Sequence, residues 1–208
     1  MRALAKLYLA SSNPGKLGEF RALAGGLTAA RGAAAAPEFA LELLPEFAAL
    51  PEFAESAPTF GENALGKALH YSRFCDGLVM ADDSGLVVPA LGGAPGVHSA
   101  RYAGIGASSE ERIAKLLANM RELRGLARAA HFVCVIAAAQ GARGVAIVSE
   151  RVNGEILDVA RGSAGFGYDP VFYFSALQKT FAELGAEGKN QYSHRGKAFR
   201  RLLAALGP

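Results

Sequence analysis

The chain has 208 residues, of which 51% are hydrophobic, so it can bury a substantial core in one large domain or in two tightly joined lobes. Its formal net charge of +3, from 22 basic and 19 acidic side chains, is too small and too dispersed to predict binding to nucleic acid. Any anionic partner should therefore be a small molecule.

Cysteine usage and the N-terminus indicate the compartment. Cys75 and Cys134 are too few for a disulfide framework or a cysteine metal site, although one bridge between them is possible by count. Cys134 lies in an apolar run, where a reduced thiol acts as a small hydrophobic side chain. Lys6 interrupts the stretch that resembles a signal peptide, and no segment approaches the roughly 18 apolar residues of a membrane span. We therefore predict a cytoplasmic protein that does not cross a membrane.

The N-terminal segment predicts a strand, a loop and a helix. Residues 6–10 form the expected strand, and residues 11–15, Ser-Ser-Asn-Pro-Gly, form a turn. From Lys16 the apolar side chains have helical spacing, and Gly25-Gly26 is expected to end the helix. Hydroxyl and backbone N–H groups at the start of a helix are suited to binding anions. An ordinary capped helix without a ligand is the alternative.

Residues 28–58 are low in complexity. They contain an alanine run and copies of Pro-Glu-Phe-Ala that begin at Pro37, Pro45 and Pro51. These spacings are too short and irregular for a solenoid, so we expect a surface excursion with one strand at residues 39–44. A capping box at residues 59–62, Thr-Phe-Gly-Glu, then opens a helix.

The most informative stretch is residues 77–85, in which a short apolar run ends in Asp82 and Asp83, followed by Ser84 and Gly85. This pattern predicts a buried strand that delivers its last residues to a sheet edge. Because side chains alternate across a strand, the two carboxylates should point to opposite faces. Paired acids at a strand end are a common way to hold Mg²⁺, which takes oxygen ligands. The alternative is a solvated Asx-turn without chemistry.

The next segment predicts a loop and a helix. Glycines and prolines between Gly85 and Gly106 predict an irregular, ordered loop. Ser108-Ser109-Glu110-Glu111 then caps an amphipathic helix that should end near Gly125.

The remaining elements predict the fold class. Two strands are expected at residues 131–138 and 144–151. Asn153-Gly154 is a strong hairpin signal, so the second strand should pair antiparallel with residues 156–160. Mixed hairpins and strand–helix units together predict an α/β fold with a mixed sheet, and a basic helix ends the chain at residues 197–206.

A second constellation, residues 162–170, combines glycines with Phe166 and Asp169. Glycines on both sides of Phe166 let the backbone approach a ligand closely while the ring is held in place, and Asp169 can accept hydrogen bonds from ring N–H groups. This pattern predicts a base-stacking pocket. It matches neither the P-loop nor the dinucleotide fingerprint.

A third constellation, residues 189–197, places Ser193, His194 and Arg195 side by side, with Lys189 ahead of them. Such a cluster can donate to a base carbonyl and to phosphates. A Ser-His-Asp hydrolase triad is not supported, because no Gly-x-Ser-x-Gly nucleophile elbow is present.

Together these motifs resemble those of the inosine triphosphatase family, nearly over the whole length of the chain. They are Ser11-x-Asn13-x-x-Lys16, Thr59-Phe60-x-Glu62-Asn63-Ala64-x-x-Lys67-Ala68, Ala81-Asp82-Asp83-Ser84-Gly85-Leu86, Leu91-Gly92-Gly93-Ala94-Pro95-Gly96-Val97-x-Ser99-Ala100-Arg101, Gly165-Phe166-Gly167-Tyr168-Asp169-Pro170 and Ser193-His194-Arg195-Gly196-Lys197.

The resemblance implies a single pyrophosphatase domain over residues 1–208, an elongated α/β protein with a mixed sheet and flanking helices. Its two lobes would surround a central cleft, and it would usually form a homodimer. It also implies Mg²⁺-dependent hydrolysis of dITP, ITP and XTP to the nucleoside monophosphate and pyrophosphate, which cleanses the nucleotide pool.

The site residues follow from the same resemblance. Asp83 resembles the family's proton acceptor and metal ligand, with Lys67 and Asp82 in support. The family's metal-binding glutamate corresponds to Glu46, Glu52 or Glu55, and counting back from Phe60 favours Glu55. The predicted substrate contacts are Ser11, Ser12, Asn13, Pro14, Gly15 and Lys16 for the triphosphate, Ser84 beside Asp83, Phe166, Gly167, Tyr168 and Asp169 at the base pocket, and Lys67, Lys189, His194 and Arg195.

These residues imply a mechanism and a selectivity. Mg²⁺ on Asp83 and Glu55, with Lys16 and Lys67, would clamp the polyphosphate, so positioning and electrostatics would dominate catalysis. Hypoxanthine and xanthine carry an oxygen at C6, which the donors of His194 and Arg195 can bind. Adenine carries an amino donor there, so ATP should be a poor substrate.

Two other functions remain open. One is a pyrophosphatase for other modified nucleotides, such as methylated pyrimidine triphosphates. The other is a non-catalytic nucleotide sensor, which would bind tightly without turnover. A panel of nucleoside triphosphates separates these possibilities.

Overall fold

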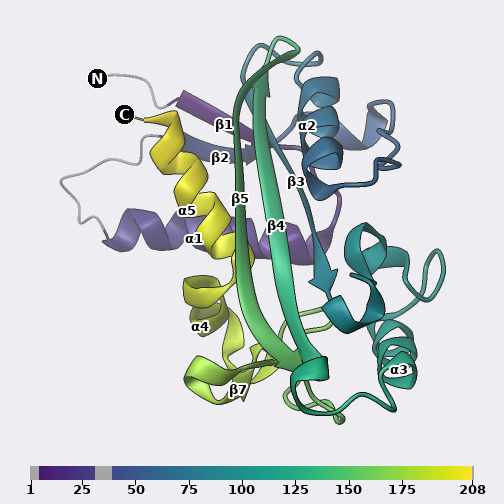
Figure 1. Ribbon diagram of the computed structural model, residues 1–208. Coiled ribbons are helices and arrows are strands. Elements are labelled where there is room, and N and C mark those ends of the chain that lie inside the picture. Colours follow the sequence, from purple (N-terminus) through teal and green to yellow (C-terminus); the bar gives the residue numbers. More distant parts are fainter. Residues whose placement is uncertain (1–4, 31–38, 208) are drawn as a thin grey trace. The chain divides into compact units, whose positions relative to one another are not determined.

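A computed structural model of the protein describes residues 5–30 and 39–207, so the alanine run and Pro37 lie outside the described residues (Figure 1). Within the described part, the strands form a seven-stranded sheet in the order β2-β1-β3-β4-β5-β6-β7. The strands are β1 (Ala5–Leu9), β2 (Phe39–Leu43), β3 (Leu78–Val87), β4 (Ala129–Gln140), β5 (Arg143–Ile156), β6 (Phe172–Phe174) and β7 (Lys179–Thr180).

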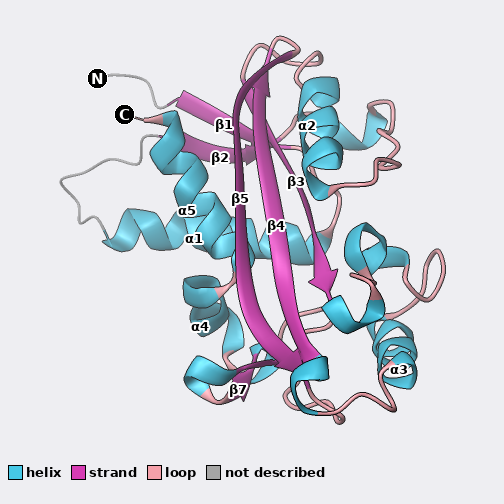
Figure 2. Ribbon diagram, in the orientation of Figure 1, coloured by secondary structure: helices cyan, strands magenta, loops and turns pink. Residues whose placement is uncertain are grey.

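The sheet is mixed, as predicted. Strand β1 pairs in parallel with β2 and β3, whereas β6 pairs antiparallel with β5 and β7. Helices flank the strands (Figure 2), and their bounds are α1 (Pro14–Ala30), α2 (Phe60–Tyr71), α3 (Ser109–Asn119), α4 (Gly185–Tyr192) and α5 (His194–Leu206). None of the helices in the described ranges is long and apolar enough to span a membrane. The predicted α/β class with a mixed sheet is therefore confirmed.

The helix starts predicted from capping residues are confirmed. Ser108 accepts a hydrogen bond from the backbone of Glu111 at 3.1 Å, and the Glu111 carboxylate accepts one from the Ser108 backbone at 2.7 Å, which completes the capping box of α3. Thr59 likewise caps α2 by accepting from the backbone of Glu62 at 3.2 Å. The loop predicted after Gly85 contains two short 3₁₀ helices, Pro89–Leu91 and Gly96–Arg101.

The chain divides into two compact units. Unit 1 comprises the described residues of Met1–Asp83, Cys134–Ser149 and Gly196–Pro208, and unit 2 comprises Ser84–Val133 and Glu150–Arg195. The long strands β3, β4 and β5 pass from one unit into the other, and along β3 the boundary falls between Asp83 and Ser84.

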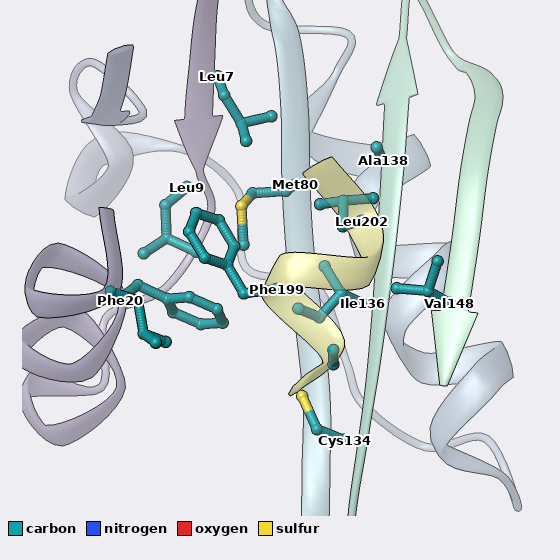
Figure 3. Close-up of a cluster of buried hydrophobic side chains, with 12 residues drawn as sticks. Leu7, Leu9, Phe20, Met80, Cys134, Ile136, Ala138, Val148, Phe199 and Leu202 are labelled. Carbon is teal, nitrogen blue, oxygen red and sulfur yellow. The ribbon is translucent and has the colours of Figure 1, made fainter. Parts of the chain in front are cut away.

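Unit 1 has its own hydrophobic core (Figure 3). Phe20 of α1 and Phe199 of α5 meet edge to face with ring centroids 5.5 Å apart, and Met80 of β3 packs in the same cluster. Burying each such side chain stabilises the fold by about 1.5–3 kcal/mol. Cys134 is also fully buried here and no disulfide joins it to Cys75, which confirms its predicted packing role.

Unit 2 has a separate core that is rich in aromatic rings. The ring centroid of Phe172 lies 4.6 Å from that of Phe132 and 4.9 Å from that of Phe181. Leu116 of α3 and Met120, which directly follows the helix, are fully buried in the same cluster. The predicted apolar face of α3 therefore packs as its spacing indicated.

The hairpin predicted at Asn153-Gly154 is wrong, because both residues lie inside β5. The φ angle of Gly154 is not left-handed, and a Cβ on it would lie 2.5 Å from the carbonyl oxygen of Tyr173. The glycine therefore permits close approach of β6. The two-residue turn lies instead at Gly141-Ala142, where both φ angles are positive, at 53° and 61°, as a type I′ turn requires.

Helix α3 ends at Asn119, before the predicted end near Gly125. Two further predicted element ends are also wrong. Helix α1 continues past Gly25-Gly26 to Ala30; a Cβ on Gly25 would meet open space, so the glycine costs only helix propensity, about 1 kcal/mol. Strand β3 continues through Ser84 and Gly85 to Val87, so the Asx-turn alternative is wrong. In both places the flanking structure outweighs a local turn signal.

Candidate functional site

The candidate residues fall into two sets, one in each unit. In unit 1, β3 presents the two aspartates to different helices, as strand alternation predicts. Asp82 is fully buried and forms an ion pair of 3.0 Å with Lys16 of α1. Asp83, 6% exposed, accepts a hydrogen bond of 3.0 Å from the Asn63 amide of α2.

The loop before α1 is ordered by its own polar side chains. The Asn13 side chain accepts a hydrogen bond from the backbone of Lys16 at 3.1 Å, and the buried Ser11 hydroxyl accepts one from the backbone of Asn13 at 3.3 Å. Ser12 and Pro14 are exposed, and Gly15 is half-buried. No acidic side chain occupies the first turn of α1, so this helix N-terminus is compatible with an anion.

Glu55 joins this set through Lys67 of α2, with which it forms an ion pair. Burial by itself lowers the pKa of Lys67, but the charges of Glu55, Asp82 and Asp83 raise it above its ordinary value. Glu46 and Glu52 are exposed, and Glu46 begins a 3₁₀ helix at Phe47–Ala49 with a left-handed φ of 55°. Of the three glutamates considered from the sequence, Glu55 therefore has the surroundings that a metal ligand needs.

The electrostatics of this set centre on Asp83. Burial raises the pKa of Asp83 to about 6, the charges of Glu55 and Asp82 add to the increase, and Lys16 and the Asn63 hydrogen bond oppose it. The set thus contains three carboxylates and two lysines, so its formal charge is negative. Such a set favours an added cation.

A divalent ion fits this chemistry. Within residues 5–30 and 39–207, no three His, Cys, Asp or Glu side chains converge closely enough to hold an ion by themselves. Mg²⁺ does not need three, because it is bound by one or two carboxylates and completes its shell with water and substrate phosphates. Asp83 and Glu55 supply oxygen ligands of the kind that it prefers.

In unit 2, Asp169 organises the second set. Its carboxylate forms an ion pair with Lys189, and the two side chains are only 2% and 4% exposed. The same carboxylate accepts a hydrogen bond from the backbone of Phe166 at 2.8 Å. Gly165 has a φ of 77°, and a Cβ there would collide with this carboxylate, so only glycine fits.

Cations surround the Phe166 ring. The Lys189 ammonium lies 4.6 Å from the ring centroid and the Arg195 guanidinium carbon 5.6 Å from it, both within cation–π range. Arg195 also donates to the Ser84 hydroxyl at 2.8 Å. The sequence predicted Phe166, Lys189 and Arg195 as substrate contacts, and the structure places them in one cluster, which Ser84 joins.

His194 is held by a ring that the sequence analysis did not consider. Its imidazole stacks on Phe132 of β4 with centroids 4.6 Å apart and planes 8° apart, and both side chains are buried. A buried imidazole in one orientation can offer a directed donor to a ligand.

Some predicted contacts have structural partners instead. The hydroxyl of Tyr168 donates to the carbonyl of Ser99 at 3.0 Å inside the core of unit 2, and burial raises the pKa of Tyr168. The backbone N–H of Gly167 donates to the Ser109 hydroxyl at 3.2 Å. In the sequence, Asn63 is only one position of a motif, but its i, i+4 spacing from Lys67 indicates that the two side chains share a helix face.

Comparison with known proteins is consistent across the chain. A sequence model described as the Ham1 family matches residues 7–205. A dITP/XTP pyrophosphatase from Geobacillus kaustophilus is 47% identical over 200 residues, covering 95% of this chain and 92% of the relative. A Ham1 protein from Coxiella burnetii has a TM-score of 0.82 at 39% identity, covering 97% of this chain and 98% of that one. The Staphylococcus aureus Ham1 protein has a TM-score of 0.80 at 38% identity, with 97% of each chain covered.

Proposed function

Because this chain belongs to the Ham1 family, we propose that it hydrolyses dITP, XTP and ITP to the nucleoside monophosphate and pyrophosphate. The family assignment made from the six sequence motifs is confirmed by these matches. The reaction cleaves an acid anhydride, and it would remove deaminated purine nucleotides from the nucleotide pool.

The set in unit 1 supplies the groups that a polyphosphate requires. Lys16 and Lys67 provide positive charge, and the N-terminus of α1 adds the positive end of the helix dipole. Asp83 and Glu55 would hold Mg²⁺, which when bound neutralises phosphate charge and orients water. Asp83, whose pKa is about 6 in the metal-free protein, would be the carboxylate that accepts a proton from the attacking water.

The set in unit 2 supplies the groups that a 6-oxo purine requires. Phe166 offers an aromatic surface, while His194 and Arg195 offer hydrogen-bond donors. Adenine would bring its own donor to these donors, and a site built on such hydrogen bonds rejects a mismatched partner by up to about 10⁴–10⁵.

One observation carries the proposal. Strand β3 places Asp83 of the first set and Ser84 of the second set in consecutive positions. The acidic, phosphate-directed set and the aromatic, base-directed set thus each contain one of two adjacent residues of the same strand.

A substrate panel tests the proposal. Pyrophosphate release from dITP, XTP, ITP, GTP, ATP and a methylated pyrimidine triphosphate is measured with and without Mg²⁺. We expect Mg²⁺-dependent release from the first three. Equal turnover of ATP, preference for the pyrimidine, or tight binding without release would contradict the proposed function.

The resemblance also supports a cytoplasmic homodimer, and we include both properties in the proposal. Light scattering on the purified protein is expected to give twice the chain mass of 21.6 kDa. A monomer that retains full activity would contradict the dimer.

A further inference from the structure

The segment before α2, residues 51–57, has no regular secondary structure, yet α2 contacts every second residue of it. At its start, the Nε2 atom of His70 lies 2.8 Å from the carbonyl oxygen of Pro51. At its end, the side-chain amide of Asn63 accepts from the Ala57 N–H at 2.9 Å and donates to the Ala57 carbonyl at 3.3 Å. The segment therefore runs antiparallel to the helix.

Between these ends lie the contacts of Phe53 and Glu55. The Phe53 N–H donates to the Tyr71 hydroxyl at 3.3 Å, and Glu55 forms the ion pair with Lys67. The even-numbered neighbours at 52, 54 and 56 are exposed. An extended segment with alternate residues held has one definite register along the helix.

The ring of Phe53 fits against Gly66 of α2. A Cβ added at Gly66 would lie 2.6 Å from the Phe53 Cζ atom, closer than real Cβ contacts occur. The same ring lies 5.7 Å from the His70 imidazole, centroid to centroid. Because Gly66 has no side chain, the space beside it accommodates the Phe53 ring. We call this space the socket.

The repeated sequence provides two similar segments that could pack against α2. Pro-Glu-Phe-Ala occurs at Pro45 and again at Pro51, so Phe47 stands six residues before Phe53. At the same offset from Glu55 stands Ala49, which has no carboxylate. A slip by one copy would present a similar proline and phenylalanine to α2 but would remove the acid beside Lys67.

We propose that the Phe53–Gly66 contact is a positioning element that sets the register of residues 51–57 on α2 and thereby holds Glu55 beside Lys67 and close to Asp83. Phe53 and Gly66 touch neither substrate nor metal; they act through Glu55. The consequence for Mg²⁺ rests on the proposed function, whereas the register itself does not.

The central test is Gly66→Ala. The added methyl displaces the Phe53 ring and, with it, the backbone two residues before Glu55. We expect the dissociation constant of Mn²⁺, measured by electron paramagnetic resonance on the nucleotide-free protein, to rise about tenfold or more, as for other residues that orient metal ligands. The Mg²⁺ concentration for half-maximal pyrophosphate release should rise similarly, with kcat at saturating Mg²⁺ little changed.

Gly61→Ala is the matched control. It adds the same methyl to the same helix, but the new Cβ would have only the Thr59 hydroxyl nearby, at 3.9 Å. We expect Mn²⁺ affinity and Mg²⁺ dependence like those of the wild type. A Gly61→Ala defect equal to that of Gly66→Ala would overturn the positioning role.

A second substitution that restores Mn²⁺ binding distinguishes a positioning role from a general loss of structure. In Gly66→Ala/Phe53→Leu the smaller, flexible side chain makes room for the methyl, and we expect Mn²⁺ affinity to return toward the wild-type value. Phe53→Leu alone leaves the socket partly empty and should weaken Mn²⁺ binding, which keeps the test valid if Gly66→Ala does not fold. Wild-type Mn²⁺ affinity in folded Gly66→Ala, or in Phe53→Leu, overturns the inference.

Failure of the proposed function gives a different result. A wild-type protein that releases no pyrophosphate from dITP or XTP, while Gly66→Ala still lowers Mn²⁺ affinity, would leave the positioning role intact and reject the activity. Full activity of the wild type, with no effect of Gly66→Ala on Mn²⁺ affinity, would support the proposed function and reject the positioning role.

Discussion

The two residue sets handle charge in opposite ways. In unit 1, Asp82, Asp83 and Glu55 lie near Lys16 and Lys67, and burial together with the neighbouring carboxylates raises the pKa of Asp83 to about 6. In unit 2, Asp169 and Lys189 neutralise each other, and both are almost completely buried. Under the proposed function, the first set would therefore respond to cations, phosphates and pH, whereas the second would be a rigid frame for the purine ring.

The largest expected effect tests the responsive set. Asp83→Asn removes the proposed proton acceptor and metal ligand while keeping the volume and a hydrogen-bond acceptor for Asn63. Pyrophosphate release from XTP at saturating Mg²⁺ should fall by about 10²–10⁴. Asp76→Asn, on an exposed residue before β3, serves as the control and should behave as the wild type. Near-normal release by Asp83→Asn would remove Asp83 from catalysis.

Base selectivity tests the rigid frame. The ratio of kcat/KM for XTP over ATP should be at least about 10³ in the wild type. Arg195→Met removes a donor beside Phe166 and should reduce the ratio to about tenfold, mainly by lowering kcat/KM for XTP. An unchanged ratio would show that Arg195 does not read the base.

Stability distinguishes the two ion pairs directly. Lys189→Met leaves the Asp169 carboxylate buried without its cation, so the free energy of unfolding should fall by about 3–5 kcal/mol. Lys67→Met breaks a pair whose glutamate is 32% exposed, and should cost about 1 kcal/mol or less. Denaturant unfolding of both variants measures the difference, and equal losses would break the contrast between the sets.

The last expected effect is a pH dependence in the metal-free protein, smaller than the loss predicted for Lys189→Met. Because the pKa of Asp83 in the folded state, about 6, exceeds its ordinary value of 3.8, ionising this carboxyl disfavours folding. The penalty is absent below pH 3.8 and is fully developed above pH 6. Asp83→Asn should therefore raise the free energy of unfolding by about 2–3 kcal/mol at pH 7.

The gain in Asp83→Asn should shrink toward zero as the pH falls to 4, and thermal unfolding at both pH values measures it. A gain that is the same at both pH values would show that the effect comes from packing rather than from the charge of Asp83.

Much of the fold could be predicted where the signal is local. The capping residues Thr59 and Ser108 start their helices through hydrogen bonds to residues three positions later, so a short window contains the whole interaction. The alternation of Asp82 and Asp83 is likewise a property of any strand. The Asn153-Gly154 signal predicted a hairpin wrongly because Gly154 is required for the close approach of Tyr173 in β6. A short sequence window does not contain that contact.

The candidate residues could be chosen from the sequence, but their partners could not. Glu46 and Glu52 lie within copies of Pro-Glu-Phe-Ala and Glu55 directly follows one, but the contacts of Glu55 arise only because α2 holds residues 51–57. Tyr168 belongs to the same motif as Asp169, yet its hydroxyl is bound to Ser99 in the core. Neighbours in a motif can thus have different tasks.

The sequence by itself determined the residue types, the order of the motifs, the helix caps and the alternation of the β3 carboxylates, because these depend on covalent geometry and short-range hydrogen bonds. Only the tertiary structure decided which charges face each other, how far the pKa of Asp83 rises and which glutamate joins Lys67. Burial and Coulomb interactions depend on distances between residues that are remote in the chain, and folding alone sets those distances.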